Sequence, residues 1–499
     1  MFSPRDSQKS SSPPIRPLAD RRAFLRRSTA AVAGLGAAAF ASTSSLRAEQ
    51  PGPGSSRRVG LAPGPSVASR QPLSSSPGSV CRLATPRVLT LREQDEVTHR
   101  IIEKRLDTVV PLAMREAGID MWLILCYEDA YDPIHTSMTP MNTWRPILQM
   151  LVFFDRGPDQ GVERFNISMT NMRGLFEEPW KGRYEKEQWA VLREMIAARD
   201  PKRIGIHVGD VQWLAMGLTW SLHQMLREAL PEKYAARLES AEPTATRWGA
   251  TLIDDEIELY KHVVDVASTL ISESYSRKAI VPGATTIDDL VWYHSQRVVE
   301  LGMELAFPPS FYRFRSDAET ARFGVDDPLL RPGDFIRCDI GLRYLRLITD
   351  QQHWAYILRP GETDAPEPMR RRMAQTHRLQ HIFMDEMREG LTGDEMLANM
   401  LARAHREGIT NPKIYSHSLG IFLHEPGPLI GLPWEQTSNP GRGDVKLREN
   451  SAFAMELSTG GPIPEWSAND FRVALEENVV FTQGRCRPIS GLQKEFYLV

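Results

Sequence analysis

Cysteine is scarce in this chain, and the four cysteines that it has lie far apart. Cys81, Cys126, Cys338 and Cys486 form no Cys-x-x-Cys pair within 499 residues. The sequence therefore predicts neither a zinc knuckle nor a disulfide scaffold. An oxidising compartment would still permit one pair, but the spacing does not identify its two members.

The chain also lacks an excess of charge of either sign. Sixty Lys and Arg residues face 63 Asp and Glu residues, which gives a formal net charge of −3. This balance argues against a nucleic-acid-binding surface and against an acidic tail. A hydrophobic content of 41% and a charged content of 25% are typical of a globular protein. The length predicts two domains after any leader is removed.

An apolar run near the amino terminus, from Thr29 to Ala41, is too short to span a bilayer comfortably. It follows the pair Arg21-Arg22, and Ala39-Phe40-Ala41 offers a small-residue cleavage site. This order resembles a bacterial twin-arginine signal, so we expect residues 1–41 to direct export of the folded protein to the periplasm or the medium. No cysteine ends the run, which argues against a lipoprotein anchor.

The next two segments differ sharply in composition. Residues 42–86 are rich in Ser, Pro, Gly and Arg, which predicts a disordered linker. Residues 87–249 begin with the helical pattern of Leu91–Ala117 and continue with short apolar runs typical of buried strands, the first at 121–125. Strands that alternate with helices predict an α/β layer domain.

Two histidines and two tryptophans of this first domain need an interpretation. His135 and His207 are more simply explained as hydrogen-bonded structural histidines than as ligand contacts. Trp122 and Trp213 are most simply residues of the core. None of the four is therefore predicted to belong to a functional site.

Residues 250–499 form the second predicted domain. Four helical stretches occur in two pairs, and strand-like runs lie between and after them, which indicates α+β packing. Thr286 with Asp289, and Thr392 with Glu395, have the spacing of helix capping boxes. The helical stretches are residues 254–279, 285–301, 369–389 and 395–407.

Four carboxylates and one histidine of this second domain lie in otherwise apolar, strand-like runs. A charge on a buried strand costs several kcal/mol unless it is paired or bound to a metal. A single acid would best be explained by a salt bridge or an exposed strand end, but five such residues indicate a common metal site. They are Asp339, Asp350, His417, Glu456 and Glu476.

Strand geometry suggests how two of these acids meet. In a strand over 335–340, Arg337 and Asp339 share one face because alternate residues point the same way. A second run, 345–350, could pair antiparallel with the first through a turn around 341–344. That hairpin would bring Asp339 and Asp350 together across one face.

The residue types predict the chemistry of the site. Four carboxylates and one imidazole balance two divalent ions with oxygen-rich ligands, which favours Mn²⁺, with Co²⁺ or Zn²⁺ as alternatives. Two such ions that share one water lower its pKa, as amide hydrolysis requires. His424, seven residues after His417, is the natural candidate to stabilise the tetrahedral intermediate.

The motifs FIRCDIG, LRLITD, HSLGIFLHEP, FAMEL and VALEENVVFT carry these residues in the order Asp, Asp, His, Glu, Glu. They resemble the pita-bread metallopeptidases, which comprise methionine aminopeptidases, Xaa-Pro aminopeptidases and prolidases. The segment DDEIELYKH and the preceding domain indicate the Xaa-Pro aminopeptidase and prolidase branch. The resemblance implies a creatinase-like α/β domain over 87–249 and an α+β pita-bread catalytic domain over 250–499.

The resemblance also implies a role for each residue of the site. Asp339 would chelate one metal and His417 the other, and Asp350 and Glu476 would bridge the two. Glu456 would be both a ligand and the general base. His424 would bind the substrate carbonyl or its oxyanion.

Two positions depart from the family pattern. Arg322 stands where the family has a histidine that contacts substrate, and Ala474 stands where proline-directed members often have an arginine. If Arg322 points into the site, it favours an anionic group near the scissile bond. The alternative is that the loop 308–327 is rearranged and Arg322 faces solvent.

We expect an exported aminopeptidase of the Xaa-Pro type that acts on short peptides. One alternative is hydrolysis of a non-peptide C–N bond on the same fold, and another is a binding module without catalysis. The complete ligand set and His424 argue against the binding module. We further expect a homodimer, no nucleic-acid partner and no stable membrane anchor.

Overall fold

The computed structural model describes residues 86–424 and 426–499. All of them fall within one compact unit, Cys81–Val499. The expected signal peptide and nearly all of the expected linker lie outside the described residues. α7 (Glu242–Ala250) ends and α8 (Asp254–Ser274) begins near the expected domain boundary, which stays a prediction.

Two findings bear on the expected thiols and on membranes. Among the described cysteines, Cys126, Cys338 and Cys486 are free thiols, and Cys81 lies outside the described residues. In the described parts of the chain, no helix combines the length and the apolar character that crossing a membrane requires.

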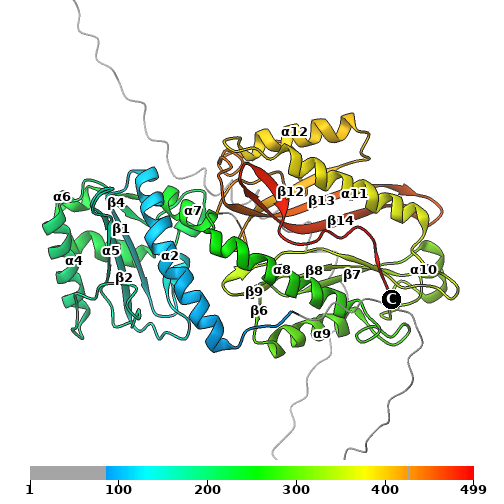
Figure 1. The fold of residues 1–499 in the computed structure, drawn as a ribbon, viewed down its shortest axis with the longest axis horizontal. Helices are drawn as coiled ribbons and strands as arrows, with labels where there is room; N and C mark the ends of the chain where they lie inside the picture. Colours follow the sequence, from blue (N-terminus) through cyan, green and yellow to red (C-terminus); the bar gives the residue numbers. More distant parts are fainter. Residues whose placement is uncertain (1–85, 425) are drawn as a thin grey trace, which may run out of the picture. The chain divides into compact units, whose positions relative to one another are not determined.

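The first region, residues 91–250, contains a mixed five-stranded sheet with helices on both faces (Figure 1). The strand order is β3-β2-β1-β4-β5, with β1 (Met121–Tyr127) antiparallel to β2 and parallel to β4. Because side chains alternate along β1, Trp122 and Ile124 pack towards α2, whereas Leu123 and Leu125 pack towards α4 and α5. The expected α/β layer domain is confirmed. The other elements are α2 (Leu91–Ala117), α3 (Pro133–Met138), β2 (Leu148–Asp155), β3 (Val162–Asn166), α4 (Glu185–Arg199), β4 (Ile204–Ile206), η2 (Trp213–Ala215), α5 (Trp220–Ala229), α6 (Glu232–Ala235) and β5 (Leu238–Ser240).

The interpretation of the two tryptophans holds for one of them. Trp122 is fully buried and donates from Nε1 to His207 Nε2 at 2.8 Å, while Asp132 Oδ2 lies 2.6 Å from His207 Nδ1. His207 is therefore a hydrogen-bonded structural histidine. Trp213 is 51% exposed, so its assignment to the core is wrong. The helical pattern around it breaks at η2, and α5 begins only after Thr219, which caps it.

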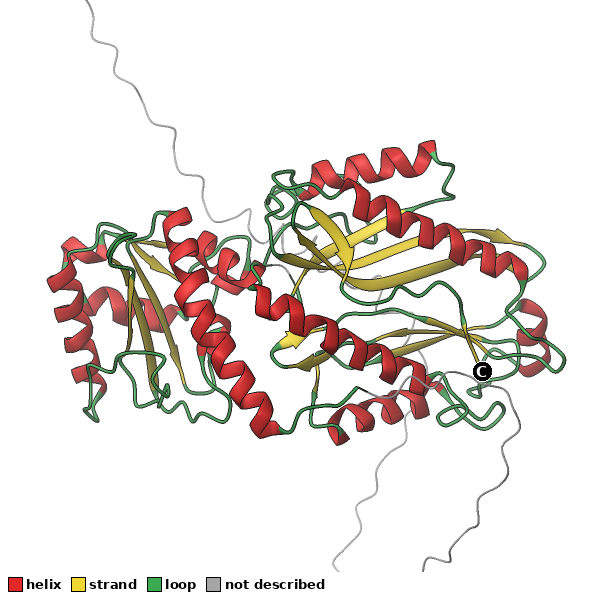
Figure 2. Ribbon diagram, in the orientation of Figure 1, coloured by secondary structure: helices red, strands yellow, loops and turns green. Residues whose placement is uncertain are grey.

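The second region, from residue 254 onward, contains two four-stranded sheets, each covered by a pair of helices (Figures 1 and 2). α8 and α9 pack on the sheet β16-β11-β8-β7, where their side chains meet Ile336, Cys338 and Ile340. α11 and α12 pack on the sheet β12-β13-β14-β15. The expected α+β pita-bread domain is confirmed. The elements are α9 (Ile287–Glu300), β6 (Glu304–Leu305), β7 (Ser310–Phe314), α10 (Asp317–Phe323), β8 (Phe335–Asp339), β9 (Leu342–Tyr344), β10 (Leu347–Ile348), β11 (Trp354–Tyr356), α11 (Glu367–Glu386), α12 (Gly393–Arg406), β12 (Lys413–Leu419), β13 (Ser451–Ile463), β14 (Ser467–Thr482), β15 (Arg485–Pro488) and β16 (Tyr497–Leu498).

The expected hairpin between 335–340 and 345–350 is wrong. β8 pairs with β7 and β11, whereas β9 pairs with β10 in a separate three-stranded sheet. Three of the four residues expected to form the turn, Leu342–Tyr344, are the strand β9. The real turn lies at Leu345 and Arg346, whose φ angles of 51° and 69° are those that a type I′ hairpin turn requires.

The two aspartates nevertheless come together. Asp339 ends β8, and the bridge between Ile340 and Gln351 places the segment that follows Asp350 beside it. Asp339 also lies on the face of β8 opposite to Cys338, as the alternation predicts. The proximity was therefore expected correctly, although the strand pairing was not.

Candidate metal centre

The three neighbouring strands β12, β13 and β14 position three of the expected ligands. Glu456 and Glu476 are cross-strand partners, and His417 on β12 pairs with Ala454, two residues before Glu456. The backbone of Glu476 also forms two hydrogen bonds of 3.1 Å with that of Gln352, in the segment that carries Asp350. This bridge joins the two large sheets at the point where their acids meet.

The ligand atoms converge in two overlapping groups. In Asp339, Asp350 and Glu476, one carboxylate oxygen of each residue lies within 4.8 Å of the others. The same limit holds for Asp350, His417 and His424. Asp350 belongs to both groups, which is the position that a residue bridging two ions would take. Four expected ligands and the expected catalytic histidine thus meet in one place.

Glu456 falls in neither group but lies within the same field of charge. Burial first, and then the charge of Asp339, raise the pKa of Glu456 to about 7, while a hydrogen bond from Gln352 opposes the rise. Gln352 Nε2 also donates to Glu476 Oε2 at 2.8 Å, so one amide contacts both glutamates. Gln352 was not expected at the site, because a lone glutamine after a strand forms no recognisable sequence pattern.

Two buried acids of the centre each have one oxygen without a partner. Asp350 Oδ1 and Glu476 Oε1 are buried and have no hydrogen-bond partner. Burial, reinforced by the neighbouring carboxylates, raises the pKa of both groups well above their usual range. Buried acids without partners are unfavourable in a protein interior. Divalent cations would supply the missing partners, so this donor set fits a metal centre.

His417 is held in the form that a metal ligand needs. Its Nδ1 lies 3.1 Å from the carbonyl oxygen of Ser418, so Nδ1 carries the proton and donates it. Its Nε2 lies 3.7 Å from Asp350 Oδ2. Burial lowers the pKa of His417 to about 3, so the ring is neutral and Nε2 presents a lone pair.

His424 lies at the accessible side of the centre. Its side chain is exposed, and its ring centroid lies 4.4 Å from that of His417. Burial of part of the ring and the charge of Arg442 lower the pKa of His424. A neutral imidazole in this place is able to donate a hydrogen bond to a substrate oxygen.

Arg322 is not brought to the metal centre. It is exposed on the last turn of α10, and its guanidinium lies 4.8 Å from the ring centroid of Phe323. α10 was not expected, although Ser316 and Glu319 form a Ser-x-x-Glu pattern that signals a helix start, and Ser316 Oγ accepts from Glu319 N. The alternative of a rearranged loop with Arg322 in solvent describes this arrangement.

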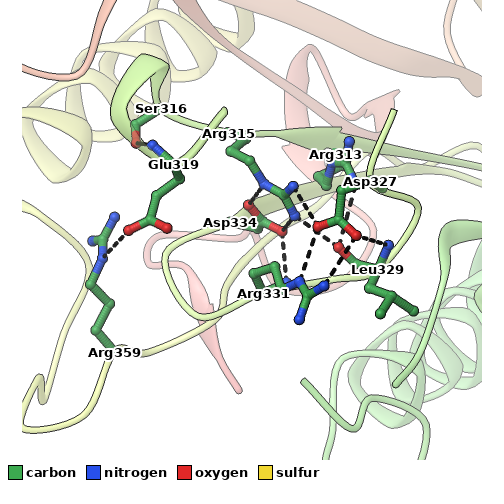
Figure 3. A network of polar contacts seen from close by, with 9 residues as sticks. All are labelled: Arg313, Arg315, Ser316, Glu319, Asp327, Leu329, Arg331, Asp334 and Arg359. Carbon is green, nitrogen blue, oxygen red and sulfur yellow. Dashed lines mark hydrogen bonds and ion pairs between the residues drawn. The ribbon is translucent and has the colours of Figure 1, made fainter. Parts of the chain in front are cut away.

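Buried ion pairs fix the conformation of that loop (Figure 3). The Arg315 guanidinium donates to both carboxylate oxygens of Asp334 at 2.7 Å and to Asp327 at 2.9 Å. Arg331 donates to the same Asp327 from Nε at 3.0 Å. The loop is thereby fastened to the start of β8 at Asp334, away from the acids at its end.

Ala474 occupies the position at which proline-directed members of the family often have an arginine. It lies two residues before Glu476, so it faces the same side of β14. Trp354 Nε1 donates to its carbonyl oxygen at 2.5 Å. The nearby Arg472 donates to Ser458 Oγ and to the carbonyl of Asn411, at 3.0 and 3.1 Å, and so does not take the place of the missing arginine.

Residues 258–483 match the model of metallopeptidase family M24. The expected recognition is confirmed, and with it the metallopeptidase class of the catalytic domain. A search of the curated proteins gave no match.

Solved structures match the fold over most of this chain. An X-Pro aminopeptidase from Thermotoga maritima MSB8 is 17% identical, with a TM-score of 0.56 over 78% of this chain and 100% of that one. A Xaa-Pro dipeptidase from Bacillus anthracis is 16% identical, with a TM-score of 0.53 over 80% and 100%. The N-terminal domain of the FACT complex subunit SPT16 from chickpea is 11% identical, with a TM-score of 0.50 over 78% and 96%. These likenesses establish the fold and leave the substrate open.

Proposed function

We propose that this protein is an exported peptidase that hydrolyses short peptides with two divalent ions. The observation that carries the proposal is the cluster of buried acids with unpartnered oxygens around a neutral imidazole. Mn²⁺ is the first candidate, with Co²⁺ or Zn²⁺ next, because the donors are mostly oxygen atoms. The ligands would be Asp339, Asp350, His417, Glu456 and Glu476.

The residues around the ions would divide the chemistry between them. Bound divalent ions supply Lewis acidity, which lowers the pKa of water and polarises a carbonyl. Glu456, whose raised pKa suits proton transfer near neutral pH, would take a proton from water and pass it to the leaving amine. His424 would donate a hydrogen bond to the substrate carbonyl oxygen as negative charge develops on it.

A second candidate is hydrolysis of a non-peptide C–N bond by the same residues. Two observations favour keeping it: Ala474 offers no arginine beside Glu476, and Arg322 lies in solvent where the family places a histidine. Both positions concern the substrate and leave the metal ligands untouched. The metal chemistry is therefore common to both candidates.

A substrate panel with metal-loaded enzyme separates the two candidates. We expect two divalent ions per chain and release of the first residue from dipeptides and tripeptides. The panel should include peptides with and without proline at the second position, and a non-peptide amidine or amide. Metal-loaded protein that cleaves only the non-peptide substrate would favour the second candidate, and protein that binds no metal would contradict both.

The export proposal rests on Arg21-Arg22 and the apolar run that follows. Replacement of both arginines by lysine should leave the full-length protein in the cytoplasm. Cell fractionation with an activity assay measures this. The same fractions, passed over a sizing column with light scattering, test the expected homodimer. Unchanged export of the double variant would exclude the twin-arginine route.

A further inference from the structure

Arg337 lies at the edge of the metal centre, on the same face of β8 as Asp339. Its neighbours across the sheet are Tyr312 on β7 and Trp354 on β11. The guanidinium carbon lies 4.6 Å from the ring centroid of Tyr312, a ring that is itself exposed. This contact holds the charge at the accessible rim of the site.

No acid forms a direct pair with Arg337 among the described residues. Its guanidinium forms no hydrogen bond and no ion pair there, and its Nε is buried without a partner. Arg315, which directly follows β7, has a different environment. Its guanidinium forms ion pairs with Asp327 and Asp334 (Figure 3). Arg337 is thus a half-buried cation whose guanidinium is not engaged by any described residue.

The field of Arg337 reaches the catalytic acids. Burial raises the pKa of Asp339, and the charge of Arg337 opposes that rise. The same charge opposes the rise at Glu456. Together with the shared face of β8 and the contact with the exposed ring of Tyr312, this places the charge of Arg337 at the rim of the centre, beside Asp339.

We infer that Arg337 binds the free α-carboxylate of the substrate's leaving residue, so that the site takes dipeptides in preference to longer or amidated peptides. Five N–H donors in a planar fork match a carboxylate bidentately. This inference rests on the proposed peptidase function and names its substrate class.

The spacing along the strand agrees with a dipeptide. The Cα atoms of residues two apart on a strand lie about 6.6 Å apart, and this is the spacing of Arg337 and Asp339. One peptide residue spans about 3.5 Å, and a hydrogen bond between nitrogen and oxygen adds about 2.9 Å. A scissile carbonyl at the ions thus places the carboxylate of the next residue within reach of Arg337.

The test compares a dipeptide with its carboxamide, in one proline-ended and one alanine-ended pair. Wild type should cleave the acid with a kcat/KM about 10- to 100-fold above that of the amide, mostly through KM. Arg337→Gln should lower the acid to the level of the amide and leave the amide within about twofold. Arg337→Lys should retain part of the preference, because a single cation remains without the bidentate fork.

Arg92→Gln is the matched control, since Arg92 has a highly exposed side chain on the distant α2. It should leave both substrates unchanged. Metal content and amide cleavage show whether each Arg337 variant is folded, and Arg337→Lys replaces Arg337→Gln if the latter fails to fold. Equal cleavage of acid and amide by wild type would overturn the inference. So would an equal loss on both substrates in Arg337→Gln, which would mean that Arg337 positions the acids instead.

The two proposals fail in different ways. Wild type that holds metal and cleaves neither acid nor amide contradicts the peptidase function. Calorimetric titration of that same protein with the dipeptide and with its carboxamide still tests Arg337. Tighter binding of the acid, lost in Arg337→Gln, supports the carboxylate contact, and equal binding of both contradicts it.

Discussion

Each of the two regions contains a buried histidine beside a buried aspartate, and only one of these pairs lies in the candidate metal centre. In the first region, His207 and Asp132 are 1% and 0% exposed, with nitrogen and oxygen 2.6 Å apart. In the second, His417 and Asp350 are 1% and 5% exposed, with the corresponding atoms 3.7 Å apart. Burial alone therefore does not distinguish them.

The hydrogen-bond partners do distinguish them. The second ring nitrogen of His207 accepts from Trp122, and Asp132 Oδ1 accepts from the backbone of Ile134 and His135 at 2.8 and 3.1 Å. Asp350 Oδ1 has no partner, and further acids crowd around it. A polar network complete in itself stabilises the fold, whereas one that lacks partners indicates a ligand.

The largest expected effect on activity concerns the pair His417 and Asp350, whose hydrogen bonding is incomplete. Asp350→Asn should remove the residue shared by both ligand groups and lower kcat/KM by about a thousandfold, since metal ions supply several kcal/mol of transition-state stabilisation. The metal-free variant should melt no lower than metal-free wild type, because a repelling charge is lost. Metal content, kinetics and melting temperature of both proteins measure this. Full metal content with full activity would remove Asp350 from the centre.

His424→Ala should have the next largest effect, about a hundredfold loss of kcat through lost stabilisation of the oxyanion. Two ions per chain should remain, because the five proposed ligands are intact. Metal analysis beside steady-state kinetics is the measurement. Loss of one ion would instead make His424 a ligand, as its place near Asp350 and His417 permits.

A substitution in the pair His207 and Asp132, whose hydrogen bonding is complete, should change the stability of the protein and leave its activity unchanged. Asp132→Ala leaves His207 and two backbone N–H groups without their acceptor, at a cost of about 3 kcal/mol in the free energy of unfolding. Metal content and kcat/KM should stay at wild-type values. Urea unfolding and the peptide assay check both halves. A variant of unchanged stability that loses its metal would reverse the comparison of the two regions.

Acid should affect the two regions alike. Burial lowers the pKa of His135 in the first region and of His294 in the second to about 4. Between that value and about 6.5 the unfolded chain binds more protons, so stability falls as pH falls, by about 1 kcal/mol per histidine at pH 5.5. Urea unfolding of wild type and His294→Gln at pH 7 and 5.5 measures this. Identical pH dependence of the two proteins would exclude a contribution from His294.

The smallest expected effect is that of Arg322→Gln. Because Arg322 contacts Phe323 and solvent, cleavage of neutral and of acidic peptides should both stay within about twofold of wild type. Side-by-side kinetics on the two peptide classes is sufficient. A selective loss on acidic peptides would return Arg322 to the substrate site.

Much of the local structure could be predicted from the sequence. The helix Leu91–Ala117 has the expected bounds, and Gly118 ends it with a φ of 68°. Thr286 with Asp289 and Thr392 with Glu395 form the expected capping boxes. These features depend on side chains within about four residues of one another, so the local sequence is enough to determine them. The identities and order of the five candidate ligands were also in the sequence.

The tertiary structure decided how those residues meet. It paired β8 with β11 instead of 345–350, exposed Trp213 and Arg322, and placed His424 beside His417. It also left Arg337 without a partner at the rim of the centre. Strand pairing and burial depend on contacts between residues far apart in the chain, and a local pattern is compatible with several such pairings. The sequence therefore determined which groups are available, and long-range packing determined which of them remain free to bind a ligand.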